Sequence, residues 1–497
     1  MLKLLRYLKP YLVFMLLIIM LLYVQAMADL ELPSQMARIV NTGLQQRGVE
    51  TAVPDVMRRS LYDRLIQMSD STLQNDLAAA YKLVPRGADK GDWLERYPLL
   101  QTEPLAILQP LNTTTRNRLN TELTPWLFII HMQESGTDSG FALERPAVAT
   151  PEDMFTAIKN QLDELPSQVL EQGALAAVAA EYERVGLDLN QLQSKFIWRA
   201  GAQMLLIALI SAIASILVGL LAARLAAGVG RDLRADLFRK VTYFSSTEYD
   251  SFSPASLITR STNDVQQIQM MLVMLLRILF YAPILGVGGV LKATRSNLSM
   301  GWIIALAVTL LLGLIVILSR LAIPRFKLVQ KLVDRVNLVT REMLSGLMVI
   351  RAFNRNREQE AKFDRANTDL TRVNLFVNRL MVMMWPVMTL IMNGISLLII
   401  RIGADQIDQG SMQVGDVMAF IQYTMQIIMS FLMVSMIFIM IPRASVSAQR
   451  IDEVLKVKAS IRDPELPLSF PADGPGEVEL REVSFRYPGA DSDVLHQ

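Results

Sequence analysis

Hydrophobic positions gather into long uncharged runs along the 497-residue chain. A helix that crosses the hydrocarbon core of a bilayer, roughly 30 Å thick, needs about 20 mostly apolar residues. Five runs contain no Asp, Glu, Lys or Arg, and they cover 10–28, 200–223, 296–319, 380–400 and 417–442. A sixth run, 265–291, is interrupted by Arg277 and would return the chain to its starting side. The pattern predicts an all-α polytopic membrane protein with six transmembrane helices.

Arg277 admits two interpretations. An ionisable side chain within a transmembrane helix is by default a functional candidate. It lies near the predicted inner end of its span, however, where a long side chain can reach the polar interface. Both interpretations stay open.

Charged residues predict the orientation of the spans. Loops rich in Lys and Arg tend to remain in the cytoplasm, and the segment 320–379 is densely basic. The stretch between the first two spans carries more acidic than basic residues. Both termini are therefore predicted to be cytoplasmic in a multi-pass protein of the cell membrane, and 31–195 to be a mainly helical extracellular insertion.

The two predicted cytoplasmic loops, 224–264 and 320–379, are long and nearly free of helix breakers. Apolar residues recur in them at helical spacing, as at Leu328, Leu332 and Val336. The transmembrane helices are therefore predicted to continue into the cytoplasm. The outer turns, 292–295 and 401–416, are short.

Composition excludes several kinds of chemistry. The chain has no Cys, so disulfides, thiolate metal sites and Cys nucleophiles are excluded. Lys and Arg number 49 and Asp and Glu 47, so the net charge of +2 gives no reason to expect a nucleic-acid partner. We expect no metal site.

A short helix at the tip of each cytoplasmic loop would present apolar anchors. Tyr249 and Phe252 lie in the first tip, and Ile350 and Phe353 lie in the second beside the basic Arg351. Such side chains can dock into a groove on another domain. The alternative is that they pack between neighbouring helices.

Several of these segments resemble type IV ABC exporters, the group of multidrug and lipid exporters. The resemblance covers 1–43 and 186–497. The segments that carry it occur in order at separations typical of that family, and they are Phe244–Ser246, Tyr249–Asp264, Arg341–Glu342, Gly346, Val349–Phe353, Val414–Asp416, Ala419–Phe420, Ser447–Ile451 and Val454–Leu455. The resemblance implies that both loop tips are coupling helices. It also implies that two such subunits, identical or different, form one pathway and that the full-length protein uses ATP and Mg²⁺.

The C-terminal residues resemble the opening of the family's nucleotide-binding domain. By this resemblance Tyr487 stacks on adenine, which a planar phenol can do; the alternative is an ordinary strand tyrosine. The sequence contains no Gly-Lys pair, so the phosphate-binding loop G-x-x-x-x-G-K-[ST] is missing. We interpret the β fragment as the truncated start of that domain and do not expect these residues alone to hydrolyse ATP.

The domain organisation follows from these patterns. We expect a basic segment with the first span over 1–30, the extracellular insertion over 31–195, spans two to six with both long loops over 196–441, a linker over 442–475, and the start of a nucleotide-binding domain over 476–497.

Methionines recur every three or four residues on the last two spans. Met is flexible and polarizable, so surfaces rich in it can adapt to dissimilar apolar ligands. The candidate substrate path consists of Met384, Met388, Asn393, Gln422, Met425, Gln426, Met429 and Met433. The alternative is that these stripes are helix-packing cores.

Two functions of different classes fit the sequence. The first is an ATP-driven exporter that moves a hydrophobic or amphipathic substrate, such as a drug, lipid or peptide, across the bilayer as a dimer by alternating access. The second is a membrane receptor or sensor with an extracellular ligand-binding domain. A proton-driven transporter is disfavoured, because the spans lack the paired carboxylates of a proton relay.

The predicted orientation places residue 71 outside the cell. Since the chain has no Cys, the variant Ser71→Cys carries a single thiol. We expect this thiol to react with a membrane-impermeant reagent in intact cells. Labelling that occurs only after lysis would refute the topology.

Overall fold

Six long helices dominate the computed structural model, which describes residues 2–88, 93–135, 165–461, 466, 476–486 and 491–496. All six are long and apolar enough to cross a membrane. They are α1 (Leu12–Arg38), α8 (Leu189–Thr242), α11 (Val265–Ser296), α12 (Gly301–Ser345), α14 (Asn356–Asp408) and α15 (Val414–Lys456). The predicted all-α polytopic fold is confirmed.

Several helices begin or end at places other than those that the hydrophobic runs predict. α1 continues to Arg38, and α14 continues to Asp408, into the predicted turn 401–416. α11 continues to Ser296, so Lys292 and Arg295 are helical instead of forming a turn. α15 continues to Lys456, so the first part of the predicted linker belongs to a helix. α8 begins at Leu189, within the predicted insertion. Amphipathic or polar flanks extend each helix beyond its apolar run, since a helix needs an apolar stretch only inside the bilayer.

The chain consists of two compact units, each with its own packing. One unit comprises Met1–Val24, Ile213–Ala282 and Leu432–Gln497, and the other comprises Gln25–Ala212 and Pro283–Phe431. In the first unit, aliphatic side chains of α1, α8, α11 and α15 form one core, which includes Ile18, Leu22, Val218, Leu233, Leu276 and Ile451.

The N-terminal 3₁₀-helix Leu2–Tyr11 is fastened to α8 in this first unit. The Tyr7 hydroxyl donates to Asp236 Oδ2 (2.7 Å), and the Tyr11 hydroxyl donates to Asp232 Oδ2 (2.9 Å). In α11, Arg277 is exposed and donates to Ser215 Oγ at 3.4 Å, a contact between two helices of the same unit.

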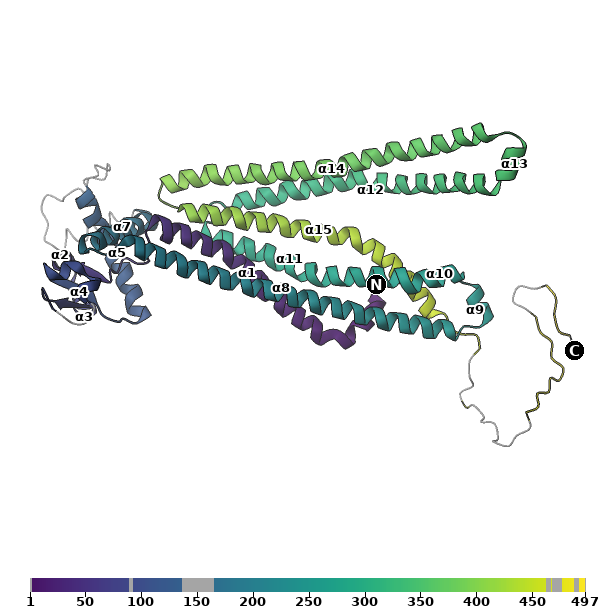
Figure 1. Cartoon of the computed structure of the whole chain (residues 1–497), viewed down its shortest axis with the longest axis horizontal. Coiled ribbons are helices and arrows are strands. Elements are labelled where there is room, and N and C mark those ends of the chain that lie inside the picture. Colours follow the sequence, from purple (N-terminus) through teal and green to yellow (C-terminus); the bar gives the residue numbers. More distant parts are fainter. Residues whose placement is uncertain are drawn as a thin grey trace. The chain divides into compact units, whose positions relative to one another are not determined.

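In the second unit, α12 and α14 lie side by side as a long antiparallel hairpin (Figure 1). The short helix α13 (Leu347–Ala352) joins them at one end. Lys362 Nζ donates to Glu342 Oε2 at 2.6 Å and braces the hairpin near α13. The sequence prediction of helices that continue through the second loop agrees with this hairpin.

The end of α1 and the π-helical turn Ile39–Gln45 that continues it approach the start of α15 in the second unit. Asn41 Oδ1 accepts a hydrogen bond from the Gly415 amide (2.8 Å), and Asn41 Nδ2 donates to Asp416 Oδ1 (3.2 Å). A Cβ on Gly415 would lie 2.5 Å from the Ala37 carbonyl oxygen, so only glycine permits this contact.

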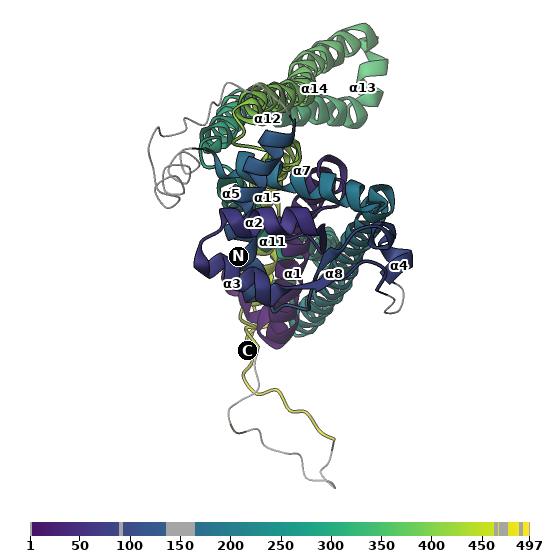
Figure 2. The same ribbon diagram turned by 90° about the vertical axis from the view of Figure 1, so that its left-hand side faces the viewer.

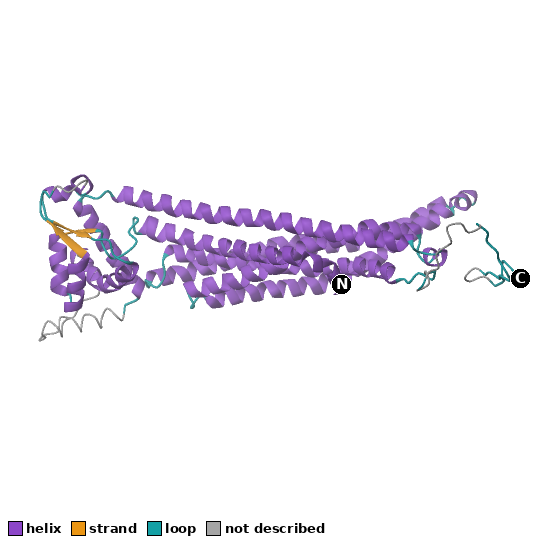
Figure 3. Cartoon of the chain, turned by 90° about the horizontal axis from the view of Figure 1, so that it is seen from below, coloured by secondary structure: helices purple, strands orange, loops and turns teal. Residues whose placement is uncertain are grey.

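An insertion domain, residues 46–188, separates α1 from α8. Its sheet is antiparallel in the order β1-β3-β2 and consists of β1 (Val56–Arg58), β2 (Tyr81–Val84) and β3 (Leu105–Leu108). Figure 3 shows these strands in orange beside the helices of the domain. The sequence analysis did not predict the sheet, because strands of three or four residues are too short to show alternation.

The helices of the insertion domain surround this sheet. They are α2 (Arg59–Met68), α3 (Ser71–Ala80), α4 (Trp93–Arg96), the 3₁₀-helix Pro98–Gln101, α5 (Thr113–Ser135) and α7 (Ser167–Val185), several of which are labelled in Figure 2. The core contains Leu65, Leu77, Leu100, Leu105, Leu123 and Val178. The domain therefore has a hydrophobic core of its own.

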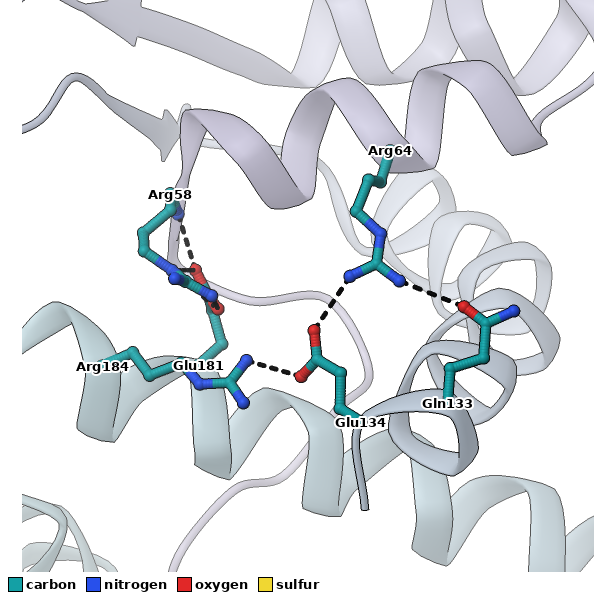
Figure 4. A network of polar contacts seen from close by, with 6 residues as sticks. All are labelled: Arg58, Arg64, Gln133, Glu134, Glu181 and Arg184. Carbon is teal, nitrogen blue, oxygen red and sulfur yellow. Dashed lines mark hydrogen bonds and ion pairs between the residues drawn. The ribbon is translucent and has the colours of Figure 1, made fainter. Parts of the chain in front are cut away.

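A network of arginines and glutamates fixes α7 to the rest of the insertion domain (Figure 4). Arg58 Nη2 and Nε reach the two oxygens of Glu181 at 2.9 and 3.0 Å, and the Arg58 amide also donates to Glu181 Oε1. Glu181 is only 2% exposed. The hydrogen bonds to Glu181 raise the pKa of the Arg58 guanidinium. A buried carboxylate with this many donors is fully compensated.

Glu134 forms the second part of this network. It accepts from Arg184 Nη1 (2.5 Å) and Arg64 Nη1 (2.9 Å), while Arg64 also donates to Gln133. Burial raises the pKa of the Glu134 carboxyl, but the two arginines outweigh burial and hold this pKa below its ordinary value. The stabilisation is therefore present above the ordinary carboxyl pKa and is lost as the pH falls through the lowered one.

We expect Glu181→Ala to lower the free energy of unfolding of the insertion domain by about 3 kcal/mol, since it leaves the guanidinium of Arg58 and a backbone amide without their acceptor. The matched control is Asp63→Ala, which removes an exposed partner of Arg59 and should cost about 0.5 kcal/mol or less. Thermal or chemical unfolding of both variants measures the difference. Equal costs would show that the buried pair contributes nothing special.

Candidate functional site

The loop between α8 and α11, the first of the two long loops, lies in the first unit and contains two short helices. They are α9 (Ser246–Asp250) and α10 (Pro254–Thr259), and the π-helical turn Arg260–Asp264 leads from α10 into α11. Ser253 caps α10 by accepting from the Ser256 amide (3.2 Å), and Pro254 occupies the first helical position. Both features are standard helix-start signals, so this loop has a defined shape.

A capping box starts α9 and also holds the chain that follows α15. Glu248 accepts from the Ser245 hydroxyl (2.6 Å) and the Ser245 amide (2.7 Å), and its other oxygen accepts from the Ser460 amide (3.1 Å). These hydrogen bonds, those of the Ser245 side chain above all, lower the pKa of Glu248 to about 2. The carboxylate is charged at neutral pH, and its stabilising effect is lost only as the pH falls from the ordinary carboxyl pKa towards 2.

Stacked side chains connect the first loop to the end of α15. Phe244 and Phe252 stack with ring centroids 6.2 Å apart, and the Arg260 guanidinium lies 5.0 Å from the centre of the Phe252 ring. Arg260 Nη1 donates to the Arg450 carbonyl oxygen (2.5 Å) and to Glu453 Oε2 (3.1 Å). The Arg260 side chain is 11% exposed, so these contacts form in a largely water-excluded place.

Asp264 adds a second link to α15. Its Oδ1 accepts from the Ser447 hydroxyl (2.9 Å), and its Oδ2 forms an ion pair with Arg450 Nη1 (3.3 Å). Asp264 is 5% exposed. The first loop and the end of α15 are thus joined by polar contacts that are costly to break, because separation would leave a buried charge unpaired. We call Arg260, Asp264, Ser447, Arg450 and Glu453 the polar latch.

The predicted anchors of the first loop have different surroundings. Phe252 is half-buried between Phe244 and Arg260, as the packing alternative anticipated. Tyr249 is 42% exposed and remains accessible to a partner.

The second loop presents apolar side chains to solvent at α13. Phe353 is 73% exposed and Met348 80% exposed, and Leu344 and Val349 are exposed beside them. Arg351 is exposed, whereas Ile350 is half-buried. Because soluble surfaces rarely gather several large exposed apolar side chains at one tip, this group is a candidate docking surface. Its members lie on the braced hairpin of α12 and α14.

The predicted nucleotide contact is not among the residues that the structure describes. Tyr487 lies outside them. Beside it, Phe485 and Leu495 pair as an isolated antiparallel bridge. Among the described residues, no three His, Asp or Glu side chains are grouped to hold a metal ion. The expectation of ATP and Mg²⁺ concerns the full-length protein, and no catalytic step is assigned to the described residues.

On α14 the candidate substrate path is divided between two faces. Met388 is 3% exposed and shares a buried face with Ile395 and Ile399, seven and eleven residues further on. Met384 is half-buried and Asn393 is exposed. The burial of Met388 favours a packing role for that residue.

On α15 an accessible stripe persists. Gln422 and Met429 are exposed, and Met425 and Met433 are half-buried at helical spacing between and after them. Gln426 lies beside the stripe, and its Nε2 donates to the Asp29 carbonyl oxygen at 3.0 Å, a contact with α1. The role of these residues in a substrate path stays a prediction.

The polar latch is the feature that sequence reasoning missed. Four of its members fall within the family-like segments Tyr249–Asp264 and Ser447–Ile451, and Glu453 lies just after the second. No sequence pattern pairs residues about 190 positions apart. The sequence offers one signal for this contact. Two charged residues, Arg260 and Asp264, lie at the end of a loop, and two more, Arg450 and Glu453, lie at the end of a span. Opposite charges at the ends of neighbouring helices commonly pair.

Six membrane-length helices with two structured loops define a polytopic membrane domain, and comparison with known proteins identifies its class. Residues 192–431 match the family described as the ABC transporter transmembrane region. The chain is 40% identical over 298 residues to an uncharacterized ABC transporter ATP-binding protein of Mycobacterium tuberculosis, covering 60% of this chain and 51% of that protein.

Two further relatives extend the comparison. The uncharacterized ABC transporter ATP-binding protein YfiB of Bacillus subtilis is 33% identical over 301 residues, which are 61% of this chain and 52% of that protein. An ATP-dependent lipid A-core flippase of Aromatoleum aromaticum is 26% identical over 281 residues, 55% of this chain and 45% of that protein.

Residues 192–431 therefore resemble the membrane region of ABC transporters, of the exporter kind. The resemblance to type IV ABC exporters is confirmed, and the receptor alternative is not favoured. The chain spans about half the length of the curated relatives it matches.

The polar latch predicts an unequal effect of two arginine substitutions. Arg260→Ala should lower the free energy of unfolding by about 2 kcal/mol, because Glu453 and the Arg450 carbonyl lose a largely buried donor. Arg239→Ala removes a 73% exposed side chain that pairs with Asp236 at 3.8 Å, and it should change stability by about 0.5 kcal/mol or less. Thermal unfolding of the detergent-solubilised chain compares them. An Arg260 variant as stable as the Arg239 variant would show that the polar latch does not stabilise the protein.

Proposed function

We propose that this chain supplies the membrane-spanning pathway of an ATP-driven exporter for hydrophobic or amphipathic molecules. The proposal rests on the exposed apolar tip at α13, at the end of the long hairpin of α12 and α14. The described part of the chain does not bury these side chains. Such a tip suits a groove on a nucleotide-binding domain. Relatives named as ATP-binding transporters support this partner.

The hairpin of α12 and α14 is suited to transmit movement. α14 has 53 residues, and at about 1.5 Å per residue it is roughly 80 Å long, far more than a bilayer requires. A displacement of the tip therefore tilts a helix whose other part crosses the membrane. The ion pair of Lys362 with Glu342 aligns the two arms near the tip.

In this proposal ATP and Mg²⁺ bind to the nucleotide-binding domain of the whole protein. Two subunits, identical or different, form the pathway, and alternating access moves the substrate. Both termini lie in the cytoplasm of a cell whose plasma membrane holds the protein. The name of the Aromatoleum relative, a lipid A-core flippase, favours an amphipathic lipid among the candidate substrates. The accessible stripe Gln422, Met425 and Met429 supports adaptable contacts with it.

Phe353→Ala tests the proposed docking role in the full-length protein. We expect ATP turnover to lose its stimulation by substrate and transport to fall at least tenfold, since loss of a buried aromatic anchor at an interface costs about 2 kcal/mol. The spans should stay folded, because the Phe353 side chain is largely exposed in the chain by itself. Substrate-stimulated ATPase activity and vesicle transport are measured side by side.

A matched control is Phe326→Ala, which removes a half-exposed phenylalanine from the same hairpin away from α13. Its coupling should remain at the wild-type level. Wild-type transport in a well-folded Phe353 variant would show that this residue does not couple ATP turnover to transport.

A further inference from the structure

A polar pocket in the second unit lies where the insertion domain meets the start of α8. Its volume is about 270 Å³, and its wall contains the turn 48–55, side chains of α4, α5 and α7, and the first turns of α8. Four basic side chains line it, namely Arg96, Arg116, Lys195 and Arg199. Among the described residues that line it, two are acidic, Glu50 and Asp55. The pocket therefore has an excess of positive charge.

The acidic groups of the pocket are already paired. Glu50 forms an ion pair with Arg38 (3.6 Å), and Asp55 forms one with Arg116 (3.4 Å). Within the part of the chain that the structure describes, no carboxylate forms an ion pair with Arg96, Lys195 or Arg199. In addition, Arg116 Nε is buried without a hydrogen-bond acceptor. The basic side chains of the pocket can therefore donate hydrogen bonds to an anion small enough to enter it.

The pocket has a rigid wall on the side of α8. The turn reverses at Gly48, whose φ is +83°, and a Cβ there would lie 3.0 Å from the backbone of Gln193. Phe196 is 5% exposed in the same wall, with the Arg38 guanidinium 5.5 Å from its ring centre. The basic side chains on α8 are thus presented from a packed surface.

The side chains of α8 mark the level of the bilayer surface. Trp198 is 80% exposed, and tryptophans of this kind concentrate at the membrane interface. Leu205, 73% exposed, begins an exposed apolar stretch that continues through Leu206, Leu209 and Ile210. Arg199 is six residues from Leu205, a rise of about 9 Å. In a bilayer that covers this apolar stretch, Lys195 and Arg199 would lie at the depth of the lipid headgroups.

We propose that this pocket binds the phosphate-bearing anionic headgroup of a lipid in the leaflet next to the insertion domain, with the acyl chains lying along α8. Arginines suit phosphate oxygens because their planar guanidinium donates two parallel hydrogen bonds, and lysine adds a point charge. The proposal requires α8 to cross the bilayer, but it does not require the protein to export this lipid.

Binding of short-chain lipids to the full chain in zwitterionic detergent tests the proposal. Native mass spectrometry would compare dioctanoyl phosphatidylglycerol with dioctanoyl phosphatidylcholine, which differ in net charge but share their acyl chains. We expect phosphatidylglycerol to bind more tightly. The double substitution Lys195→Glu and Arg199→Glu should weaken its binding about twentyfold or more, since each basic residue near a membrane surface contributes roughly a factor of five.

Two variants serve as controls. Lys82→Glu with Arg86→Glu makes the same change of charge on the insertion domain, away from α8. Neither residue lines the pocket, so binding should remain unchanged. Lys195→Arg with Arg199→Lys keeps both charges and should retain most of the affinity, which separates loss of charge from misfolding.

Three outcomes would overturn the proposal. Equal weakening by the Lys82 and Arg86 substitutions would mean that only the total charge of the domain matters. Equal affinity for phosphatidylglycerol and phosphatidylcholine would mean that the headgroup charge is not recognised. Glycerol 3-phosphate that binds as tightly as the lipid, with the same sensitivity to Lys195 and Arg199, would assign the pocket to a soluble phosphate instead.

Discussion

The pairing of backbone hydrogen bonds inside a bilayer is the constraint on which the rest of this structure depends. Hydrocarbon offers no partner for an amide or a carbonyl, so a chain of this composition must cross it as unbroken helices. α8 and α14 have 54 and 53 residues, more than twice the number that a crossing requires. Most of the length of each helix therefore lies outside the hydrocarbon, where water competes for hydrogen bonds and packing must be secured in other ways.

The parts of the helices outside the apolar runs are secured by polar contacts of two kinds. In the first unit, the polar latch places Asp264 and Arg260 in largely buried positions, where loss of one partner is expensive. In the second unit, the ion pair of Lys362 with Glu342 is about half exposed and contributes little to stability. The first contact is thus suited to hold a loop and a helix end as one piece. The second aligns two arms while leaving them free to bend.

The elements that can be predicted from the sequence are those whose pattern extends over many residues. Six apolar runs predict the spans, because a helix needs about 20 mostly apolar residues to cross the hydrocarbon. Arg277 does not interrupt α11, since a single charged side chain can reach a polar neighbour such as Ser215. The strands β1 to β3 escaped notice because each has only three or four residues and is recognisable only through its partners.

Contacts between distant residues were harder to predict than elements. The methionine spacing on α14 does not distinguish Met388, which is buried, from a residue that faces a pathway, because both roles use the same helical period. Likewise Gln426 has the polarity of a substrate contact, yet its amide donates to the Asp29 carbonyl of α1. Which side of a helix finds a neighbour depends on three-dimensional packing, and one sequence does not contain that information.

The insertion domain illustrates how a membrane protein can carry an added function without disturbing its spans. Its buried hydrophobic cluster is drawn from residues between Val49 and Leu189, and its ion pairs at Glu181 and Glu134 also close within the domain. A domain that satisfies its own core and its own charges places few demands on the helices that flank it. Its surface is then free to acquire charge for other purposes. Arg96 of this domain and Lys195 and Arg199 at the start of α8 form no ion pair with a described carboxylate, so a contribution to stability does not explain these basic groups.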